Sequence, residues 1–235
     1  ELSIKVNETT ILSKSLRTLP EKWHGLKDKE TRFRQRYLDL IVNPESKKIL
    51  QTRSNVVRLL REYLHANEFI EVETPILQSK AGGAIAKPFL THHNALNLDM
   101  YLRIAPELYL KRLVIGGFEK VFEIGKIFRN EGIDQTHQPE FTMLESYQAY
   151  ADMNIVMDMV EDMCNYVFDN LEIDKKLEFN GEEASFSGPW KRVSMYDLVS
   201  EKFGIKINFN SKFEDLSSKL TCLLYTSDAA DEYSG

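Results

Sequence analysis

Two segments with strand character, separated by a short loop, constrain the fold of this chain more than any other feature. Residues 121–130 and 140–150 are both rich in the aromatic and β-branched residues that are typical of strands. A connecting loop of eight residues, 132–139, includes the glycine and the proline expected of a loop. Strands this close along the chain most simply pair with each other, so we predict an antiparallel hairpin.

Charged and aromatic side chains share faces of this predicted hairpin. Strand side chains alternate with a period of two. The residues placed on common faces are Glu123, Arg129 and Glu131 in the first strand and Phe141, Glu145 and Tyr147 in the second. If both faces point inward, they hold more polarity than a core tolerates without a ligand, which indicates a binding site. Alternation alone equally allows a solvent-exposed face with cross-strand Arg–Glu pairs.

Other segments alternate between helical and strand patterns. We predict helices over 44–66, 107–115, 152–171 and 194–204. Their start signals are Asn43-Pro44, Pro106-Glu107, Asp152 and Ser194. We predict strands over 1–12, 69–77, with a break at Pro75, and 100–104, and a charged linker or helix over 24–42.

Composition excludes several classes of protein. With 43% hydrophobic and 28% charged residues, the chain is typical of a folded globular protein. No stretch is long and apolar enough to span a membrane, and the N-terminus lacks a secretory pattern, so we expect a cytoplasmic location and no membrane partner. Cys164 and Cys222 are too few for a disulfide framework or a zinc site. Residues 1–61 carry 14 Lys and Arg against 7 Asp and Glu, a basic balance that suits either RNA phosphates or a solvated helix face.

Two segments of the chain resemble, in the same order, two sequence motifs of a known protein family. The residues that resemble motif 2 of class II aminoacyl-tRNA synthetases are Phe128, Arg129, Asn130 and Glu131, followed by His137, Pro139, Glu140 and Phe141. The helix over 44–66 and the segment FIEVETPIL at 69–77 resemble motif 1, which builds the dimer interface in that class. The flanks AGGAIAKPFLTHHNALNLDMYLRIAPELYLKRL and PEFTMLESYQAYAD are similar specifically to lysyl-tRNA synthetases, and the resemblance covers about residues 1–220.

The resemblance implies an α+β fold in which an antiparallel sheet is flanked by helices. It implies that residues 1–20 end an OB-fold anticodon-binding domain, that 21–43 form a linker, and that 44–221 are the N-terminal portion of the catalytic domain. We therefore expect the chain to begin inside a domain. Nothing after Tyr150 resembles the third class motif, so we expect an incomplete sheet and no turnover by these residues alone. Residues 222–235 resemble a translated sequencing adapter, and we expect them to be a non-native tail rather than a genuine disordered one.

The implied chemistry is the attack of a lysine carboxylate on the α-phosphate of ATP. These two anions repel each other, so a fixed cation that contacts both lowers the barrier. Arg129 is the catalytic candidate, because its rigid fork suits bidentate contact with phosphate and carboxylate oxygens. The implied ATP-binding residues are Arg129, Asn130, Glu131, His137 and Phe141. Mg²⁺ would bridge the phosphates, with no metal ligand expected within this chain.

Lysine recognition requires carboxylates for the ε-ammonium. The implied lysine-binding residues are Gly83, Glu107, Arg129, Glu145 and Tyr147. The implied partners are L-lysine, ATP, tRNA(Lys) and a second copy bound through motif 1. Two alternatives stay open: a non-catalytic paralogue that retains the hairpin for binding, and an aspartyl or asparaginyl ligase, whose substrates would prefer cationic contacts.

Overall fold

The computed structural model describes residues 3–19, 26–134, 136–179, 181–212 and 216–217. The chain forms two compact units, Glu1–Asp174 and Lys175–Gly235. All of the candidate site residues belong to the first unit.

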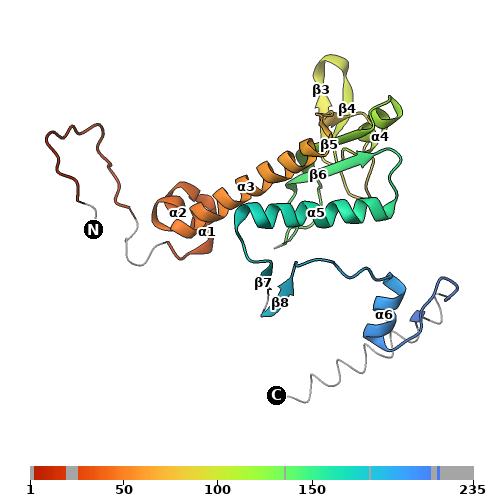
Figure 1. The fold of residues 1–235 in the computed structure, drawn as a ribbon. Helices are drawn as coiled ribbons and strands as arrows, with labels where there is room; N and C mark the ends of the chain where they lie inside the picture. Colours follow the sequence, from red (N-terminus) through yellow and green to blue (C-terminus); the bar gives the residue numbers. More distant parts are fainter. Residues whose placement is uncertain (1–2, 20–25, 135, 180, 213–215, 218–235) are drawn as a thin grey trace. The chain divides into compact units, whose positions relative to one another are not determined.

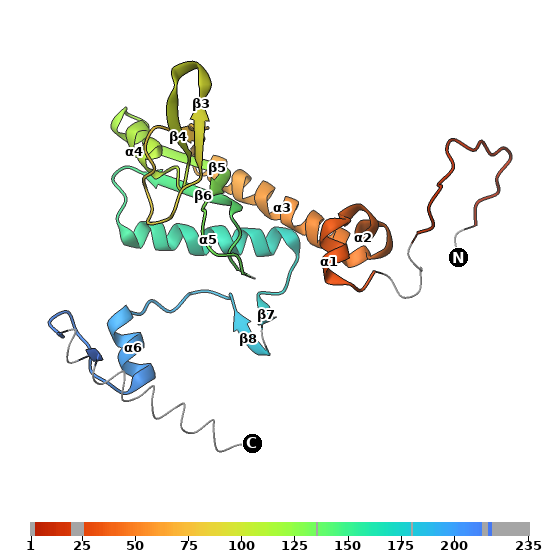
Figure 2. The same ribbon diagram turned by 180° about the vertical axis from the view of Figure 1, so that it is seen from behind.

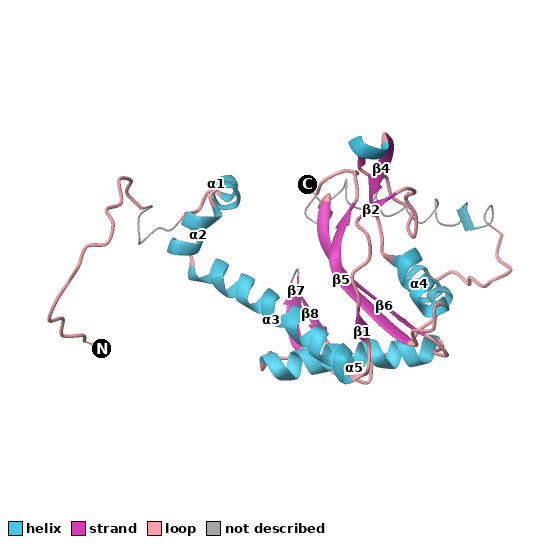
Figure 3. Ribbon diagram, turned by 90° about the horizontal axis from the view of Figure 1, so that it is seen from above, coloured by secondary structure: helices cyan, strands magenta, loops and turns pink. Residues whose placement is uncertain are grey.

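A three-stranded sheet lies at the centre of the first unit. It consists of β1 (Ile70–Glu71), β5 (Lys120–Phe128) and β6 (Glu140–Gln148) in the order β1-β5-β6. The long strands β5 and β6 are antiparallel and in register from Lys120 opposite Gln148 to Phe128 opposite Glu140, while β1 runs parallel to β5. Figure 3 shows β5 and β6 running side by side. The predicted hairpin is confirmed.

One face of the hairpin is covered by the helices α3 (Pro44–Ala66) and α5 (Met153–Leu171), which lie side by side (Figure 1). The buried centre of this layer is Leu64, Phe69 and Phe122. The partly buried hydrophobic residues packed around them are Tyr63, Ile124, Leu144, Met159 and Met163. The strand residues in this set have even numbers, so the odd-numbered side chains of β5 and β6 lie on the opposite face.

A smaller sheet and a helix lie on the other side of the hairpin from α5 (Figure 2). The sheet contains β2 (Leu77–Gln78), β3 (Leu90–His93) and β4 (Leu98–Leu102) in the order β2-β4-β3, with the 3-10 turn η1 (Asn94–Leu96) between β3 and β4. The helix α4 (Glu107–Ile115) follows β4 and packs against β5 and β6. As predicted, it ends at Ile115, and Gly116 follows as its C-cap residue.

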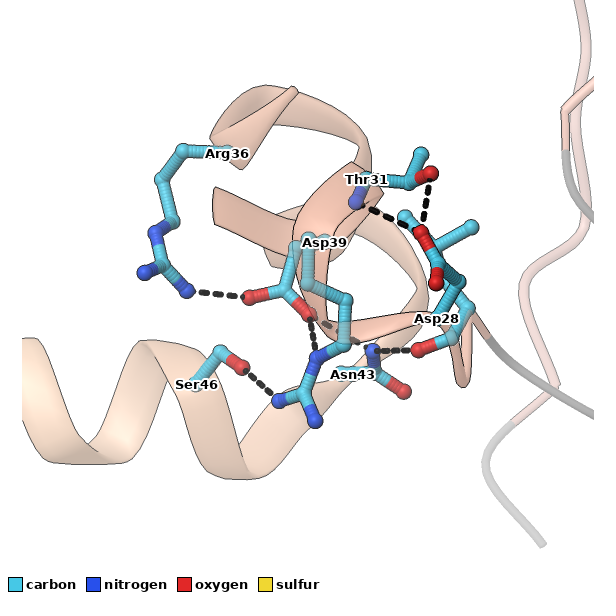
Figure 4. Close-up of polar contacts among 8 residues, drawn as sticks. Asp28, Thr31, Arg36, Asp39, Asn43 and Ser46 are labelled. Carbon is cyan, nitrogen blue, oxygen red and sulfur yellow. Dashed lines mark hydrogen bonds and ion pairs between the residues drawn. The ribbon is translucent and has the colours of Figure 1, made fainter. Parts of the chain in front are cut away.

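Two short helices, α1 (Lys29–Arg34) and α2 (Arg36–Val42), precede α3 and surround a buried carboxylate. Asp39 is inaccessible to solvent and accepts hydrogen bonds from Arg32 Nε (2.6 Å), Arg36 Nη1 (2.7 Å) and Asn43 Nδ2 (2.7 Å), part of which Figure 4 shows. These contacts, led by the one from Asn43, hold the pKa of Asp39 well below its ordinary value. Asn43 stands at the predicted N-cap position of α3 but does not cap it, because its amide donates to Asp39 and to the backbone oxygen of Leu26.

Three predicted strands differ from the structure. Residues 3–19 contain neither helix nor strand, so the strand predicted over 1–12 is wrong for its described part. Its apolar side chains Ile4, Val6, Ile11 and Leu12 are exposed, and no described strand pairs with this segment. The strand predicted over 69–77 is reduced to β1 and β2, because Pro75 has no N–H and the side chain and carbonyl of Thr74 bind Glu123 and Arg103 instead of a neighbouring strand. The strand predicted over 100–104 is β4, shifted by two residues.

The second unit contains the hairpin β7 (Lys176–Phe179) and β8 (Glu182–Ser185) and the helix α6 (Met195–Phe203). Ser194 caps α6 as predicted, since its hydroxyl accepts from the backbone N–H of Asp197, and Gly204 ends the helix with a positive φ of 63°. The proposed tail at 222–235 lies outside the described residues. None of the helices in the described ranges combines the length and the hydropathy required to cross a membrane.

Candidate active site

The odd-numbered face of β5 and β6 brings the predicted polar residues together. In the observed register Glu123 lies opposite Glu145, Val121 opposite Tyr147, and Ile127 opposite Phe141. Glu123 is buried and Glu145 and Tyr147 are half-buried, so this face is not the solvent-exposed alternative. A face with buried and half-buried acids requires cationic or hydrogen-bonding partners.

Arg129 stands just after β5 with most of its guanidinium donors available. Its backbone N–H donates to Pro139 O (2.9 Å), and its guanidinium carbon lies 5.3 Å from the centre of the Phe141 ring. The side-chain nitrogens Nε and Nη2 make only long contacts, both 3.5 Å, with Ile104 O. No carboxylate of the described residues forms an ion pair with this guanidinium, which leaves its fork free to bind the oxygens of a ligand.

A cavity of about 290 Å³ adjoins Arg129, a volume at the lower end of the usual range for small-molecule sites. Its lining residues are Arg129, Glu131, Gly132, Thr136, His137, Gln138 and Phe141. The backbone of Asn130 donates to Lys87 O (2.7 Å), and a Glu131 carboxylate oxygen accepts from Lys87 N (3.1 Å). These two contacts fasten the start of the loop to the segment between β2 and β3.

His137 is held within the loop by Asp134, a residue that the sequence did not single out. His137 Nδ1 lies 2.8 Å from Asp134 Oδ2, and Asp134 Oδ1 accepts from the backbone N–H groups of Thr136 and His137, both at 2.7 Å. These hydrogen bonds, the largest from the Thr136 N–H, hold the pKa of Asp134 well below its ordinary value. With Nδ1 engaged, Nε2 is the ring nitrogen of His137 available to a ligand.

Glu107, Glu145 and Tyr147 form an acidic cluster beside Arg129. Tyr147 Oη donates to Glu145 Oε2 (3.2 Å). Burial raises the pKa of Glu145, the Tyr147 hydrogen bond opposes that rise, and the charges of Glu107 and Glu123 add to it. Burial and the charge of Glu145 raise the pKa of Tyr147. A cation placed here would remove the repulsion between the carboxylates, so the cluster is suited to a positively charged ligand group.

Gly83 approaches the acidic cluster in a way that other residues could not. It has a φ of +88°, and a Cβ built on it would lie 3.0 Å from Glu107 Cβ and 3.2 Å from Ala105 Cβ. Only glycine combines this backbone conformation with so close an approach. The loop at 81–84 therefore lies directly against the start of α4.

A buried ion pair beneath the site was not anticipated from the sequence. Arg103 is 2% exposed, its Nη1 pairs with the Glu123 carboxylate, and its Nε donates to Lys126 O (2.9 Å). Thr74 adds a hydrogen bond from Oγ1 to Glu123 Oε2 (2.6 Å) and accepts from Arg103 at its carbonyl (3.1 Å). A Cβ on Gly125 would lie 2.2 Å from Arg103 Nη2, so the glycine within β5 makes room for the guanidinium. A glycine inside a strand pattern was the one available signal of this close approach.

The described residues do not supply a metal site. They contain no group of three or more His, Cys, Asp or Glu side chains placed to hold a metal ion. No chemical step at this site is therefore assigned to a metal held by these residues.

A second cavity, of about 830 Å³, is also lined in part by residues of this loop. It is lined by residues of α1, α2, α3 and the loop, namely Lys29, Arg32, Phe33, Arg36, Ser46, Ile49, Leu50, Ile133, Asp134 and Gln138. Its cationic side chains are partly neutralised, since Arg32 and Arg36 both pair with Asp39.

Comparison with known proteins agrees with this geometry. The chain is 53% identical over 215 residues to a protein named lysine--tRNA ligase from Syntrophomonas wolfei, an alignment that covers 92% of this chain and 44% of the relative. It is 57% identical over 207 residues to a protein of the same name from Thermotoga maritima, covering 88% of this chain and 41% of the relative. The chain thus spans less than half the length of these curated relatives. The family model for class II tRNA synthetases (D, K and N) matches residues 28–232, and the chain belongs to that family.

Proposed function

We propose that the full-length protein is a lysine–tRNA ligase that joins L-lysine to tRNA(Lys) through a lysyl-adenylate. The observation that carries this proposal is the half-buried cluster of Glu107, Glu145 and Tyr147 beside the guanidinium of Arg129, which forms no ion pair with a carboxylate of the described residues. One end of this arrangement suits the ε-ammonium of lysine, and the other suits its carboxylate and a phosphate.

In the first step a carboxylate oxygen of lysine attacks the α-phosphorus of ATP, and pyrophosphate leaves. Arg129 contacts the oxygens of both anions, so that its charge offsets their repulsion and holds them in position. No side chain acts as a nucleophile, because the attacking oxygen belongs to the substrate. In the second step a terminal tRNA hydroxyl attacks the lysyl carbonyl, and AMP leaves.

The cavity beside Arg129 receives ATP in this proposal. Phe141 stacks on the adenine ring, while Glu131 and the backbone of Asn130 bind its amino group. His137, held by Asp134 through Nδ1, reaches the phosphate end with Nε2. Support comes from the position of all four residues around one loop, and from cavity lining by Glu131, His137 and Phe141. Mg²⁺ would neutralise charge on the phosphates, and the described residues contain no side-chain group placed to hold it.

The charge of the acidic cluster favours lysine over the other two substrates of this family. Aspartate would bring a third carboxylate beside Glu107 and Glu145, and asparagine would bring no cation to Glu145. A non-catalytic paralogue is disfavoured, because Arg129, Glu131, His137 and Phe141 are all retained around one cavity.

Further partners follow from surfaces that the described residues leave uncovered. We propose a homodimer through α3 and the segment 69–77, where Ile49, Leu50 and Ile70 are exposed. We also propose that residues 1–20 end an OB-fold anticodon-binding domain, whose remainder would cover the exposed Ile4, Val6 and Ile11. tRNA would meet the basic side chains of α1 and α2 near the loop, and the location would be cytoplasmic, as the family resemblance implies.

The decisive experiment is ATP–pyrophosphate exchange by the full-length protein with lysine, aspartate and asparagine supplied singly. Exchange with lysine alone is expected. Exchange driven only by aspartate or asparagine would refute the substrate, and no exchange with any amino acid would favour the paralogue. The 235-residue chain alone should give none, because β6 has no second partner strand among the described residues and no third class motif follows it. Lysyl-adenylate formed by this chain alone would contradict that expectation.

A further inference from the structure

The acidic cluster already holds an ammonium group that belongs to the protein itself. Lys111 lies one turn after Glu107 on α4, and its Nζ is 2.5 Å from Glu107 Oε1. The same Nζ lies 6.0 Å from the centre of the Tyr147 ring. Lys111 therefore reaches from its helix toward two of the residues proposed to recognise the substrate.

The Lys111 side chain has the same chemistry as the substrate side chain. Both end in a primary ammonium on a four-carbon stem, and both satisfy a carboxylate through charge-assisted hydrogen bonds. Two ammonium groups on the Glu107 carboxylate would repel each other. A bound lysine and the Lys111 ammonium at its present position are therefore in competition for Glu107.

Displacing the Lys111 ammonium from Glu107 costs little free energy. The Lys111 side chain is 53% exposed and that of Glu107 is 29% exposed, and exposed pairs at this helical spacing contribute weakly to stability. The ammonium can thus move into solvent when a ligand arrives. In its present position it offsets the repulsion that Glu107 and Glu145 exert on each other.

Other charges around the cluster do not serve the same purpose. Arg103 is committed to Glu123 beneath the sheet face, and Arg129 contacts Ile104 O and the Phe141 ring. Of the charged groups facing the cluster from β5, β6 and α4, Lys111 is the one that pairs with Glu107.

We propose that Lys111 is a specificity-determining residue that occupies Glu107 in the free enzyme and is displaced by the ε-ammonium of lysine. It acts as an internal competitor, so that only a ligand able to satisfy Glu107 and Glu145 together displaces it efficiently. This inference rests on the proposed lysine ligase activity.

The test is the KM for lysine in pyrophosphate exchange by the full-length protein carrying Lys111→Met. Loss of the competitor should lower this KM about 1.5- to 2.5-fold with kcat unchanged, in keeping with a weak pair. Lys111→Arg, which retains a cation on Glu107, should keep the KM at or above the wild-type value. Lys111→Gln serves as a second neutral variant if the methionine variant folds poorly.

A matched control is Lys126→Met. Lys126 pairs with Glu140 at 2.9 Å, and its even number in β5 places it on the face of the hairpin opposite the acidic cluster. The substitution therefore removes the same charge from that opposite face. Its KM for lysine should equal that of the wild type. An unchanged or raised KM in both neutral Lys111 variants would overturn the inference, and so would an equal decrease in the control. Absence of lysine-dependent exchange in the wild type would instead refute the proposed function.

Discussion

Replacing Gly125 by alanine should disrupt the buried ion pair under the site. The new Cβ would lie 2.2 Å from Arg103 Nη2 and 3.1 Å from Glu123 Oε1, so the guanidinium or the strand must move. Separating a buried pair costs about 3–5 kcal/mol. Relaxation of the strand around an added methyl group costs about 1–3 kcal/mol. We expect the free energy of unfolding of β5 and β6 to fall by an amount between these ranges, about 2–4 kcal/mol.

Native-state hydrogen exchange of the full-length protein measures this loss where it occurs. A local decrease of about 2–4 kcal/mol lowers the protection of the β5 and β6 amides roughly 30- to 1000-fold. Gly132→Ala is the control, since a Cβ there meets no atom within 4 Å and the residue has no positive φ. It should leave the protection of both strands unchanged.

Testing Gly125→Ala again in a protein that lacks the ion pair separates the clash with Arg103 from a general effect of alanine on the strand. In a variant with Arg103→Leu and Glu123→Leu, the polar atoms that the new methyl group meets are absent, so Gly125→Ala should cost less than about 1 kcal/mol. Equal costs in the two backgrounds, or wild-type protection in Gly125→Ala itself, would refute this account of the glycine.

Three further changes have defined expected outcomes. Arg129→Lys should lower kcat for lysine-dependent pyrophosphate exchange about 100-fold or more while the melting temperature stays unchanged, because the guanidinium makes only long protein contacts; equal kcat values would count against its role. Glu145→Gln should raise the KM for lysine at least about 30-fold. The same variant should also raise the ligand-free melting temperature at neutral pH. The pKa of Glu145 is raised in the folded state, so its contribution to wild-type stability is present in acid, where the carboxyl group is protonated, and is lost as pH rises. The higher melting temperature of the Gln variant should therefore vanish at low pH. Asp39→Asn should lower the melting temperature at pH 7. The pKa of Asp39 is lowered in the folded state, so its carboxylate stabilises the fold at pH values above the ordinary pKa of an aspartate, and this stabilisation is lost as pH falls. A difference in melting temperature between wild type and variant that persists undiminished in strong acid would contradict the prediction.

The parts of the fold that could be predicted depend on local pattern. The β5–β6 hairpin, α3, α4 and α5 follow from periodicity and helix-start residues that a short window of sequence contains. Strands that depend on a distant partner were predicted less well. β1 pairs with β5 some 50 residues away, and only Ile70 and Glu71 of the predicted segment enter that ladder.

In the candidate site too, features set by local pattern were predictable and features set by tertiary packing were not. Strand alternation correctly placed Glu123 on the face with Glu145, but could not show that Arg103 from β4's end neutralises Glu123 beneath that face. The spacing of Glu107 and Lys111 is visible in the sequence as a helical pair, whereas the position of Lys111 beside Tyr147 depends on how α4 packs on β6. Buried charge pairs therefore required the tertiary structure.

The most direct test of lysine recognition is calorimetric titration of the full-length protein with a non-hydrolysable lysyl-adenylate analogue, compared with its aspartyl counterpart. We predict that the lysyl compound binds at least about 100-fold more tightly, and that Glu145→Gln removes most of this preference by leaving the ammonium without one of its carboxylates. Equal affinity for the two analogues, or a preference for the aspartyl compound, would contradict the assignment of Glu107 and Glu145 as the lysine-recognising acids.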